Sequence, residues 1–438
     1  MICPQSEDSH RFSGAGQSSS SCAHGVTAGA LNCRYDSRVH CIVHMRNTRF
    51  PAVAAFFTTS MLGGNSASTV KCGVRRASGI GMALLAAGIL SGLSPDALVA
   101  GEIAGPSAAA RDGAIAVSVP YATNRRREHS GASSYEYGSE RGSPAFGQCE
   151  VTFEPIPIIN ELAAKVPFYV PAETTELRVT SQRDETGFLE ALSDAVTRTS
   201  SGSVVVFVHG YNYGFDRTCR VAAELQRALL DEAVVLMFSW PSNGRPSDYL
   251  PDQADVEWSV PFLAHILRRL GDRLGRENVQ VLAHSLGTRG VVFALADLSR
   301  HGNERRVTGP LVLMAPDFDA QAFVERLPDL VPLTSGITLY ASSNDTPLKV
   351  SQQLHDAPRL GQAGEFLTVA DGMQTVDVSA LGRYQVLGHE YFLFHPRVAA
   401  DLKILLGEGR DARARPWLEP ATRDGLIYWT LGAEGVDR

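Results

Sequence analysis

Short, wholly apolar segments alternate with helix-like segments through the second half of the chain, and this alternation restricts the fold more than any other feature. The central segments 204–208 and 311–315 are apolar on both faces of a pleated strand. Such strands belong in a parallel sheet that helices cover on both sides. Between them, residues 188–196, 221–229 and 262–270 place apolar side chains at helical spacing. This repeated order of a strand, a helix and another strand predicts an α/β fold with right-handed crossovers.

Eight segments have the apolar and β-branched composition that strands favour. In chain order they are Cys149–Phe153, Glu176–Thr180, Val204–Val208, Val234–Ser239, Val279–Ala283, Leu311–Ala315, Ile337–Ala341 and Thr375–Val378. We therefore expect a doubly wound, mostly parallel central sheet of about eight strands with helices on both faces. The connection at 316–336 is too short for a large cap domain. Ligands of such sheets bind beyond the carboxyl ends of the strands, so the loops there hold the candidates for chemistry.

The N-terminal part divides into two segments before the folded part begins. Residues 1–70 are irregular and rich in Ser and Gly, and we expect disorder there, or sequence upstream of the true start. Within 71–104, basic residues precede the uncharged apolar run 79–93, and small residues follow it, as in a secretory signal. The run is shorter than the about 20 residues of a spanning helix. We expect an exported or membrane-anchored envelope protein, and a cytoplasmic one if 79–93 is not a signal.

The remaining residues divide into a linker, a main domain and a tail. Residues 105–146 are polar and are interpreted as a linker, in which Ile115–Val119 forms a short edge strand. The basic cluster Arg125–Arg127 is expected in a solvated loop. The α/β domain is placed at 147–408, where the strand and helix patterns occur, and 409–438 is interpreted as a C-terminal tail.

Composition and charge exclude several classes of protein. With 44% hydrophobic and 20% charged residues in 438, the chain is neither wholly disordered, collagen-like nor a polytopic membrane protein. A net charge of −7 gives no indication of nucleic-acid binding. Seven cysteines are too few for a disulfide scaffold. Cys149 and Cys219 are expected as two unpaired buried thiols, with a disulfide between them as the alternative in an exported protein.

Residues 279–287, VQVLAHSLG, carry the strongest indication of chemistry. An apolar strand ends in Ala283, Ser285 follows, and a helical pattern begins after Gly287. This is the arrangement of a nucleophile elbow, in which a sharp turn raises a serine above the sheet and requires small neighbours. Ser285 is thus the candidate nucleophile, although serine also caps helices. The Leu286 amide, at the start of the helix, is a candidate oxyanion donor.

A serine nucleophile needs a base and an orienting carboxylate, which follow it in this fold in the order acid, histidine. Asp345 lies in the loop after the seventh predicted strand, and His389 lies in the loop after the last one. We therefore predict a triad of Ser285, Asp345 and His389. Asp317, after the sixth predicted strand, is the alternative acid, and it could otherwise cap the next helix.

The second oxyanion donor is expected in the loop after the third predicted strand. Residues 209–214 read HGYNYG, where Gly210 permits a tight turn and the Tyr211 amide is the candidate donor. His209 is interpreted as structural, holding this loop by hydrogen bonds. The 240–244 loop and Tyr249 are expected over the same end of the sheet, either lining a substrate pocket or merely connecting elements.

Several motifs together carry a resemblance. They are FVHGYN at 207–212, FSWPS at 238–242, AHSLG at 283–287 and APD at 315–317, with YATNR at 121–125 and ERG at 140–142. Over about 118–406 the sequence resembles an α/β-hydrolase family of bacterial proteins known only as esterase/lipase-superfamily enzymes. The resemblance implies a hydrolase fold with the serine triad on Ser285, Asp345 and His389. It implies no particular substrate.

The sequence thus predicts a serine hydrolase that cleaves carboxylic esters through an acyl-enzyme intermediate. The expected partner is a small-molecule or lipid-like ester, with membrane anchoring through 79–93 as a further expectation. This chemistry needs no cofactor and no metal ion. The alternative is an envelope-associated binding protein that keeps the fold without turnover.

Overall fold

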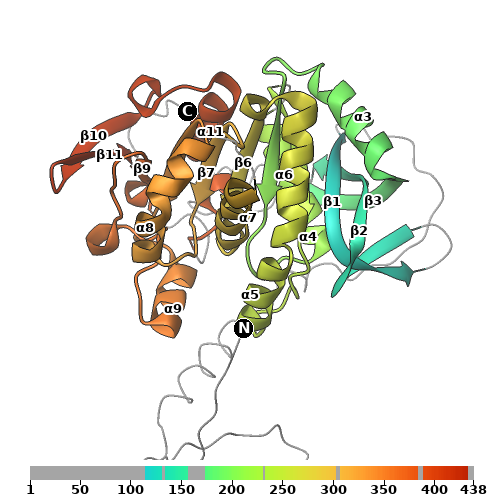
Figure 1. Ribbon diagram of the computed structural model, residues 1–438, viewed down its shortest axis with the longest axis horizontal. Helices are drawn as coiled ribbons and strands as arrows, with labels where there is room; N and C mark the ends of the chain where they lie inside the picture. The colour runs from blue at the N-terminus through green and yellow to red at the C-terminus, as the bar shows by residue number, and fades with distance from the viewer. Residues whose placement is uncertain are drawn as a thin grey trace, which may run out of the picture. The chain divides into compact units, whose positions relative to one another are not determined.

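A single sheet of eleven strands forms the centre of the part of the chain that the structure describes. The computed structural model describes residues 114–130, 134–155, 173–229, 232–301, 306–382 and 388–432. The strands are β1 (Ile115–Ser130), β2 (Ser134–Pro155), β3 (Glu173–Arg183), β4 (Ser203–Val208), β5 (Ala233–Ser239), β6 (Val279–His284), β7 (Pro310–Met314), β8 (Gly336–Ala341), β9 (Gln374–Asp377), β10 (Leu418–Arg423) and β11 (Leu426–Leu431). Their order across the sheet is β10-β11-β9-β8-β7-β6-β4-β5-β1-β2-β3 (Figure 1).

Eight neighbouring strands of this sheet, from β11 to β1, run parallel to one another. Antiparallel strands extend both edges, with β2 and β3 beyond β1 and β10 beyond β11. Each of the eight segments predicted as strands corresponds to one of the strands β2 to β9. The predicted segment either lies inside the observed strand or differs from it by one residue at each end. The predicted α/β fold with a mostly parallel sheet is confirmed, and the sheet is wider than expected.

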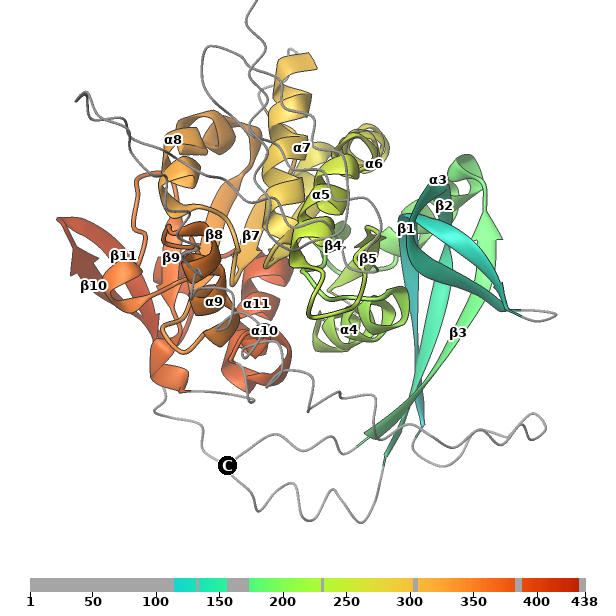
Figure 2. The same ribbon diagram turned by 90° about the horizontal axis from the view of Figure 1, so that it is seen from below.

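Helices cover both faces of the sheet because successive strand residues point to opposite sides. The helices are α3 (Glu185–Val196), α4 (Phe215–Leu229), α5 (Tyr249–Trp258), α6 (Val260–Leu274), α7 (Gly287–His301), α8 (Ala320–Leu330), α9 (Thr346–His355), α10 (Tyr391–Phe394) and α11 (Pro396–Glu408). Val204, Val206 and Val208 of β4 pack with α3, α6, α7 and α8. Val205 and Phe207 pack on the other face with α4, α10 and α11 (Figure 2).

The segment interpreted as a linker, 105–146, instead supplies two long strands. β1 pairs in parallel with β5 and antiparallel with β2, so the strand expected at Ile115–Val119 is neither short nor at an edge. The basic cluster is divided: Arg126 is exposed, whereas Arg125 is only 1% exposed. The expectation of a solvated loop was wrong for Arg125 because charge alone does not show which face of a strand a side chain occupies.

The segment interpreted as a tail, 409–438, also belongs to the sheet. β11 lies beside β9 and pairs with β10 in a hairpin. Before this hairpin, Nη1 of Arg415 lies 2.8 Å from Oδ2 of Asp401 in α11, and both side chains are fully buried. Tyr340 of β8 donates its hydroxyl to the same Asp401 oxygen. The folded domain therefore extends past the predicted limits 147–408 on both sides.

The predictions for 1–70 and 71–104 fall outside the described residues. Within the described residues, no helix has the length and apolar character needed to cross a membrane. Cys149 and Cys219 are both buried and are not joined by a disulfide, as expected.

Candidate active site

The turn between β6 and α7 has the geometry of a nucleophile elbow. Ser285 has a positive φ of 52°, a left-handed conformation that is costly for a residue with a Cβ atom. Its amide donates to the Met314 carbonyl of β7 at 3.0 Å, and its carbonyl accepts from the Asp317 amide at 3.0 Å. These bonds hold Ser285 between the ends of two adjacent strands. Local strain of this kind persists where the surrounding structure fixes it, and it clusters at functional sites.

Close contacts around Ser285 leave no room for side chains at Gly287 and Gly210. A Cβ atom on Gly287 would lie 2.4 Å from the His209 carbonyl oxygen. A Cβ atom on Gly210 would lie 2.8 Å from the Cβ of Ser285 and 3.0 Å from Nδ1 of His284. The loop after β4 is therefore packed directly against the elbow. This contact brings the predicted nucleophile beside the loop that carries Tyr211.

Asp345 and His389 are joined directly. Nδ1 of His389 lies 2.7 Å from Oδ2 of Asp345, although the two residues are 44 positions apart in the chain. Oδ1 of Asp345 accepts from the Leu348 amide at 3.0 Å, so the carboxylate also caps the N-terminus of α9. Asp345 is fully buried and His389 is 14% exposed at its side chain. The carboxylate thus fixes one ring nitrogen and leaves Nε2 available.

The pKa values of this pair follow from burial and mutual attraction. Burial raises the pKa of Asp345, against the opposing effect of His389 and of the Leu348 amide. For His389, burial lowers the pKa, but the charge and hydrogen bond of Asp345 outweigh it and raise the pKa above 6.5. Glu390 and Asp317 add to this rise. The imidazole is therefore a stronger base than an isolated one.

His389 lies beside the elbow, in contact with His284. Among the described residues, the Ser285 hydroxyl has no hydrogen bond to His389. The ring of the adjacent His284 lies 4.8 Å from that of His389 and 4.8 Å from that of Phe392. Burial lowers the pKa of His284 well below the usual value, so this ring packs as a neutral group. In free enzymes, the bond between nucleophile and base is often long and tightens only with substrate.

Asp317, the alternative acid, has other partners. Its Oδ1 accepts from Nε of Arg359 at 2.7 Å and from the Ser351 hydroxyl at 2.6 Å. Its Oδ2 accepts from the Tyr249 hydroxyl at 2.7 Å. No hydrogen bond joins it to His389 among the described residues. Nor does Asp317 cap the next helix, because Asp319 caps α8.

The two candidate oxyanion donors are the amide of Leu286, in the elbow, and the amide of Tyr211, in the loop that packs against the elbow. Within the described residues, no backbone or side-chain acceptor is bonded to the Tyr211 or the Leu286 amide. His209 holds the first loop, as expected, with Nδ1 2.8 Å from the Gly210 carbonyl and Nε2 3.2 Å from the Trp240 carbonyl. Neither amide is therefore occupied by an acceptor of the described residues, which an oxyanion donor requires.

Tyr249 links the loops around the site. Its ring packs edge-on against Tyr211 at 5.3 Å and against His355 at 5.6 Å. Since its hydroxyl also bonds Asp317, Tyr249 connects α5 to the carboxyl end of β7 and to α9. The expectation that it stands over this end of the sheet is confirmed.

Two residues near the site were not recognised from the sequence as functional candidates. Arg125 and Asp252 are both buried beside the loop that carries Tyr211. The signal for Arg125 was available in the YATNR motif at 121–125, whereas Asp252 stands in a helix with no recognisable motif.

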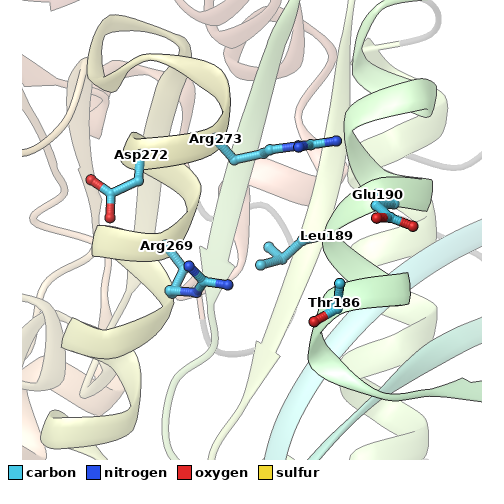
Figure 3. A pocket seen from close by; sticks show the side chains of 6 residues that line it. All are labelled: Thr186, Leu189, Glu190, Arg269, Asp272 and Arg273. Atoms are coloured by element: carbon cyan, nitrogen blue, oxygen red, sulfur yellow. The ribbon is translucent and has the colours of Figure 1, made fainter.

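Apart from the candidate triad, the described residues contain a pocket between two helices but no candidate metal site. Within them, no group of three or more His, Cys, Asp or Glu side chains could hold a metal ion. A pocket between α3 and α6 is lined by Thr186, Leu189, Glu190, Arg269, Asp272 and Arg273 (Figure 3). Arg269 and Arg273 extend from α6 toward α3, and Asp272 points away from it. None of the predicted triad or oxyanion residues lines this pocket.

Solved structures with some likeness to this chain include esterases and lipases. An esterase from Pyrobaculum calidifontis is 14% identical, with 61% of this chain and 83% of that chain covered and a TM-score of 0.31. Aspergillus fumigatus lipase B is 15% identical, with 48% and 53% covered and a TM-score of 0.32. A carboxylesterase cloned from a metagenomic library, EstE1, is 12% identical, with 61% and 84% covered and a TM-score of 0.28. No curated protein sequence matches the chain significantly.

A family match accounts for the central part of the fold. Residues 184–408 match the family described as "alpha/beta hydrolase of unknown function (DUF900)". The match covers β4 to β9 with the helices between them, including Ser285, Asp345 and His389, and excludes the motif at 121–125. Because it spans more than half of the 438 residues, the chain belongs to this family of α/β hydrolases.

Proposed function

We propose that this protein is a serine hydrolase that cleaves carboxylic esters through Ser285, His389 and Asp345. One observation carries the proposal: the His389 imidazole is bonded at Nδ1 to the buried Asp345 carboxylate, at the carboxyl end of the parallel strands, where Ser285 is held in a strained turn. An acid that fixes one nitrogen of an imidazole leaves the other to accept a proton. A serine hydroxyl is a weak nucleophile without such a base.

The reaction follows from these roles. Nε2 of His389 removes the Ser285 proton as Oγ attacks the ester carbonyl, and the Tyr211 and Leu286 amides bind the oxyanion. The imidazolium then gives its proton to the leaving alcohol as the carbon–oxygen bond breaks, which leaves an acyl-serine. Water, activated by the same imidazole, adds to the acyl group, and the acid product departs with Ser285 restored. General base catalysis contributes about 10²–10⁴ in rate, and each oxyanion donor about 10²–10³.

Two features favour turnover over a binding role. Buried carboxylates are costly unless they are bonded, and Asp345 is fully buried where it bonds the imidazole. The left-handed conformation of Ser285 is likewise a cost that a simple helix cap does not require. A binding protein that keeps only the fold has no use for either.

The test is turnover and labelling at Ser285. The full chain should hydrolyse short p-nitrophenyl esters and react covalently with a fluorophosphonate, with the adduct located on Ser285 by peptide mass spectrometry. Ser285→Ala should abolish both while the melting temperature stays near that of the parent. Ser351→Ala is a matched control at a nearby buried serine, and it should keep the label on Ser285. A folded parent that neither labels nor turns over esters would be a binding protein, and the proposal would be wrong.

The signal-like pattern before the described domain supports a second, separate proposal: the protein is exported to the cell envelope, or is anchored there through 79–93. Fractionation of cells that express the full chain, followed by N-terminal sequencing, tests it. Recovery of the whole chain in the cytoplasm would contradict it.

A further inference from the structure

Arg125 is a buried cation that touches the loops around the candidate site. It stands in β1 and is 1% exposed, and its guanidinium makes four hydrogen bonds. Two of these reach the loops after β4 and β5: Nη2 donates to the Tyr213 carbonyl at 2.6 Å, and Nη1 to the Ser242 carbonyl at 2.9 Å. The others reach the Ser239 hydroxyl at 2.8 Å and the Gly138 carbonyl at 3.1 Å.

Asp252 binds the same two loops. This carboxylate, in α5, is fully buried, and its Oδ2 accepts from the Asn212 amide at 3.2 Å and from the Ser242 hydroxyl at 2.5 Å. Its Oδ1 accepts from the Asn243 amide at 2.7 Å. The Ser242 hydroxyl in turn accepts from the Tyr213 amide at 3.0 Å.

The two charges are therefore linked through Ser242 and not by direct contact. Arg125 donates to the carbonyl of Ser242, and the side chain of Ser242 donates to Asp252. Burial lowers the pKa of Arg125 to about 9, against the charge of Asp252, which raises it. Burial raises the pKa of Asp252, and the hydrogen bonds that it accepts from Ser242, Asn243 and Asn212 oppose this rise. Buried ion pairs are a poor source of stability compared with apolar packing, so their value here lies in the backbone groups that they orient.

Arg125 and Asp252 orient the part of the 209–214 loop that follows Tyr211, the candidate oxyanion donor. The Asn212 amide is bound directly, and both backbone groups of Tyr213 are held, while Tyr211 precedes them immediately. Asn212 has a positive φ of 62°, so this stretch keeps a conformation that needs outside support. Oxyanion donors act because they are fixed in advance, and a displacement of about 1 Å can cost about 10²-fold in rate.

We propose that Arg125 and Asp252 are positioning residues that fix the loop 209–214 and thereby set the strength of the oxyanion hole at the Tyr211 amide. The inference rests on the proposed function. It also assigns a catalytic purpose to β1, which lies outside the part of the chain that the family match covers.

The experiment compares variants per competent active site. Fluorophosphonate titration counts the active sites that can react. When kcat is calculated per titrated site, misfolded molecules do not lower it. Asp252→Asn and Arg125→Lys should lower kcat about 10- to 100-fold with KM near that of the parent. The affinity for a trifluoromethyl ketone, whose adduct carries an oxyanion, should fall by a similar factor. Arg125→Lys keeps the charge but cannot reach all four acceptors. Arg125→Met loses the charge and all four hydrogen bonds, so its kcat should fall further.

The neighbouring Arg126 provides the matched control. It lies on the same strand, is 55% exposed at its side chain and pairs with Glu140 at the surface. Arg126→Met should keep the kcat and the ketone affinity of the parent. If Arg125→Met does not fold, the Asp252→Asn and Arg125→Lys variants decide the question.

Two results would overturn the inference in distinguishable ways. If the parent turns over esters and the Asp252 and Arg125 variants match its kcat and ketone affinity per titrated site, the loop does not depend on them, and only this inference fails. If the parent neither labels at Ser285 nor hydrolyses esters, the proposed function fails, and the inference fails with it.

Discussion

The Asp345 carboxylate lies 2.7 Å from Nδ1 of His389, and its second oxygen binds the Leu348 amide at the start of α9. One buried group therefore orients the imidazole and is itself held by a helix N-terminus. The helix end favours the ionised carboxylate, and the ionised carboxylate favours the tautomer that leaves Nε2 free of a proton. This relationship gives the proposed mechanism its first test.

Asp345→Asn should reduce kcat by about 10⁴-fold, because an amide favours the wrong imidazole tautomer while occupying the same space. The variant keeps an oxygen for the Leu348 amide, so its fold should survive. Steady-state kinetics on a p-nitrophenyl ester, with circular dichroism to follow the fold, measure both. A loss below about tenfold would show that another group orients His389.

Asp317→Asn should behave differently, because Asp317 is bonded to Arg359, Ser351 and Tyr249 and not to His389. Removing its charge leaves the buried Arg359 without a counter-ion, a loss of about 3–5 kcal/mol in the free energy of unfolding. Urea denaturation should report this loss, while kcat per titrated site falls far less than in Asp345→Asn. A larger loss of kcat than in Asp345→Asn would make Asp317 the acid.

The pH profile should reflect the raised pKa of His389. The imidazole must be neutral to accept the serine proton, so kcat/KM should fall as the pH drops through an inflection above 6.5. Asp345, Glu390 and Asp317 all raise this pKa, and burial opposes them. In Asp345→Asn the largest attraction is lost and burial remains, so the inflection of the residual activity should move to lower pH. An unchanged inflection would assign the titration to another group.

Gly210→Ala tests the packing of the oxyanion loop against the elbow. The new Cβ atom would lie 2.8 Å from the Cβ of Ser285, so one of the two backbones must move. We expect a loss of about 10² in kcat/KM, since small displacements at a reacting centre have effects of this size. Gly214→Ala, in the same loop, is the control, because its Cβ atom would meet no atom within 4 Å. Equal activity in the two variants would contradict this account.

The elements of this structure that the sequence predicts are those whose residues form a recognisable pattern. Strands β4 to β8 are buried on both faces, so their uniform apolar runs were recognisable, and their alternation with helices predicted the parallel sheet. Ser285, Asp345 and His389 could be selected as candidates because the fold fixes which loops follow which strands. β1 lacks such a run, since charged residues occupy its second half and only Arg125 among them turns inward. Asp252 binds the Asn212 and Asn243 amides and the Ser242 hydroxyl, and such contacts leave no trace in residue type.

The C-terminal hairpin provides a last prediction, on stability. Ending the chain at residue 408 would remove β10, β11 and Arg415, leaving the buried Asp401 with Tyr340 as its partner and no counter-ion. Arg415→Met isolates this effect, and it should lower the free energy of unfolding by about 3–5 kcal/mol. The double variant Asp401→Asn, Arg415→Met removes both charges and should recover part of the loss. Urea denaturation of the parent and the three variants measures these differences. If Arg415→Met unfolds at the same urea concentration as the parent, the Arg415–Asp401 pair contributes nothing to the free energy of unfolding. The hairpin is then held only by the pairing of β11 with β9 and by its apolar contacts.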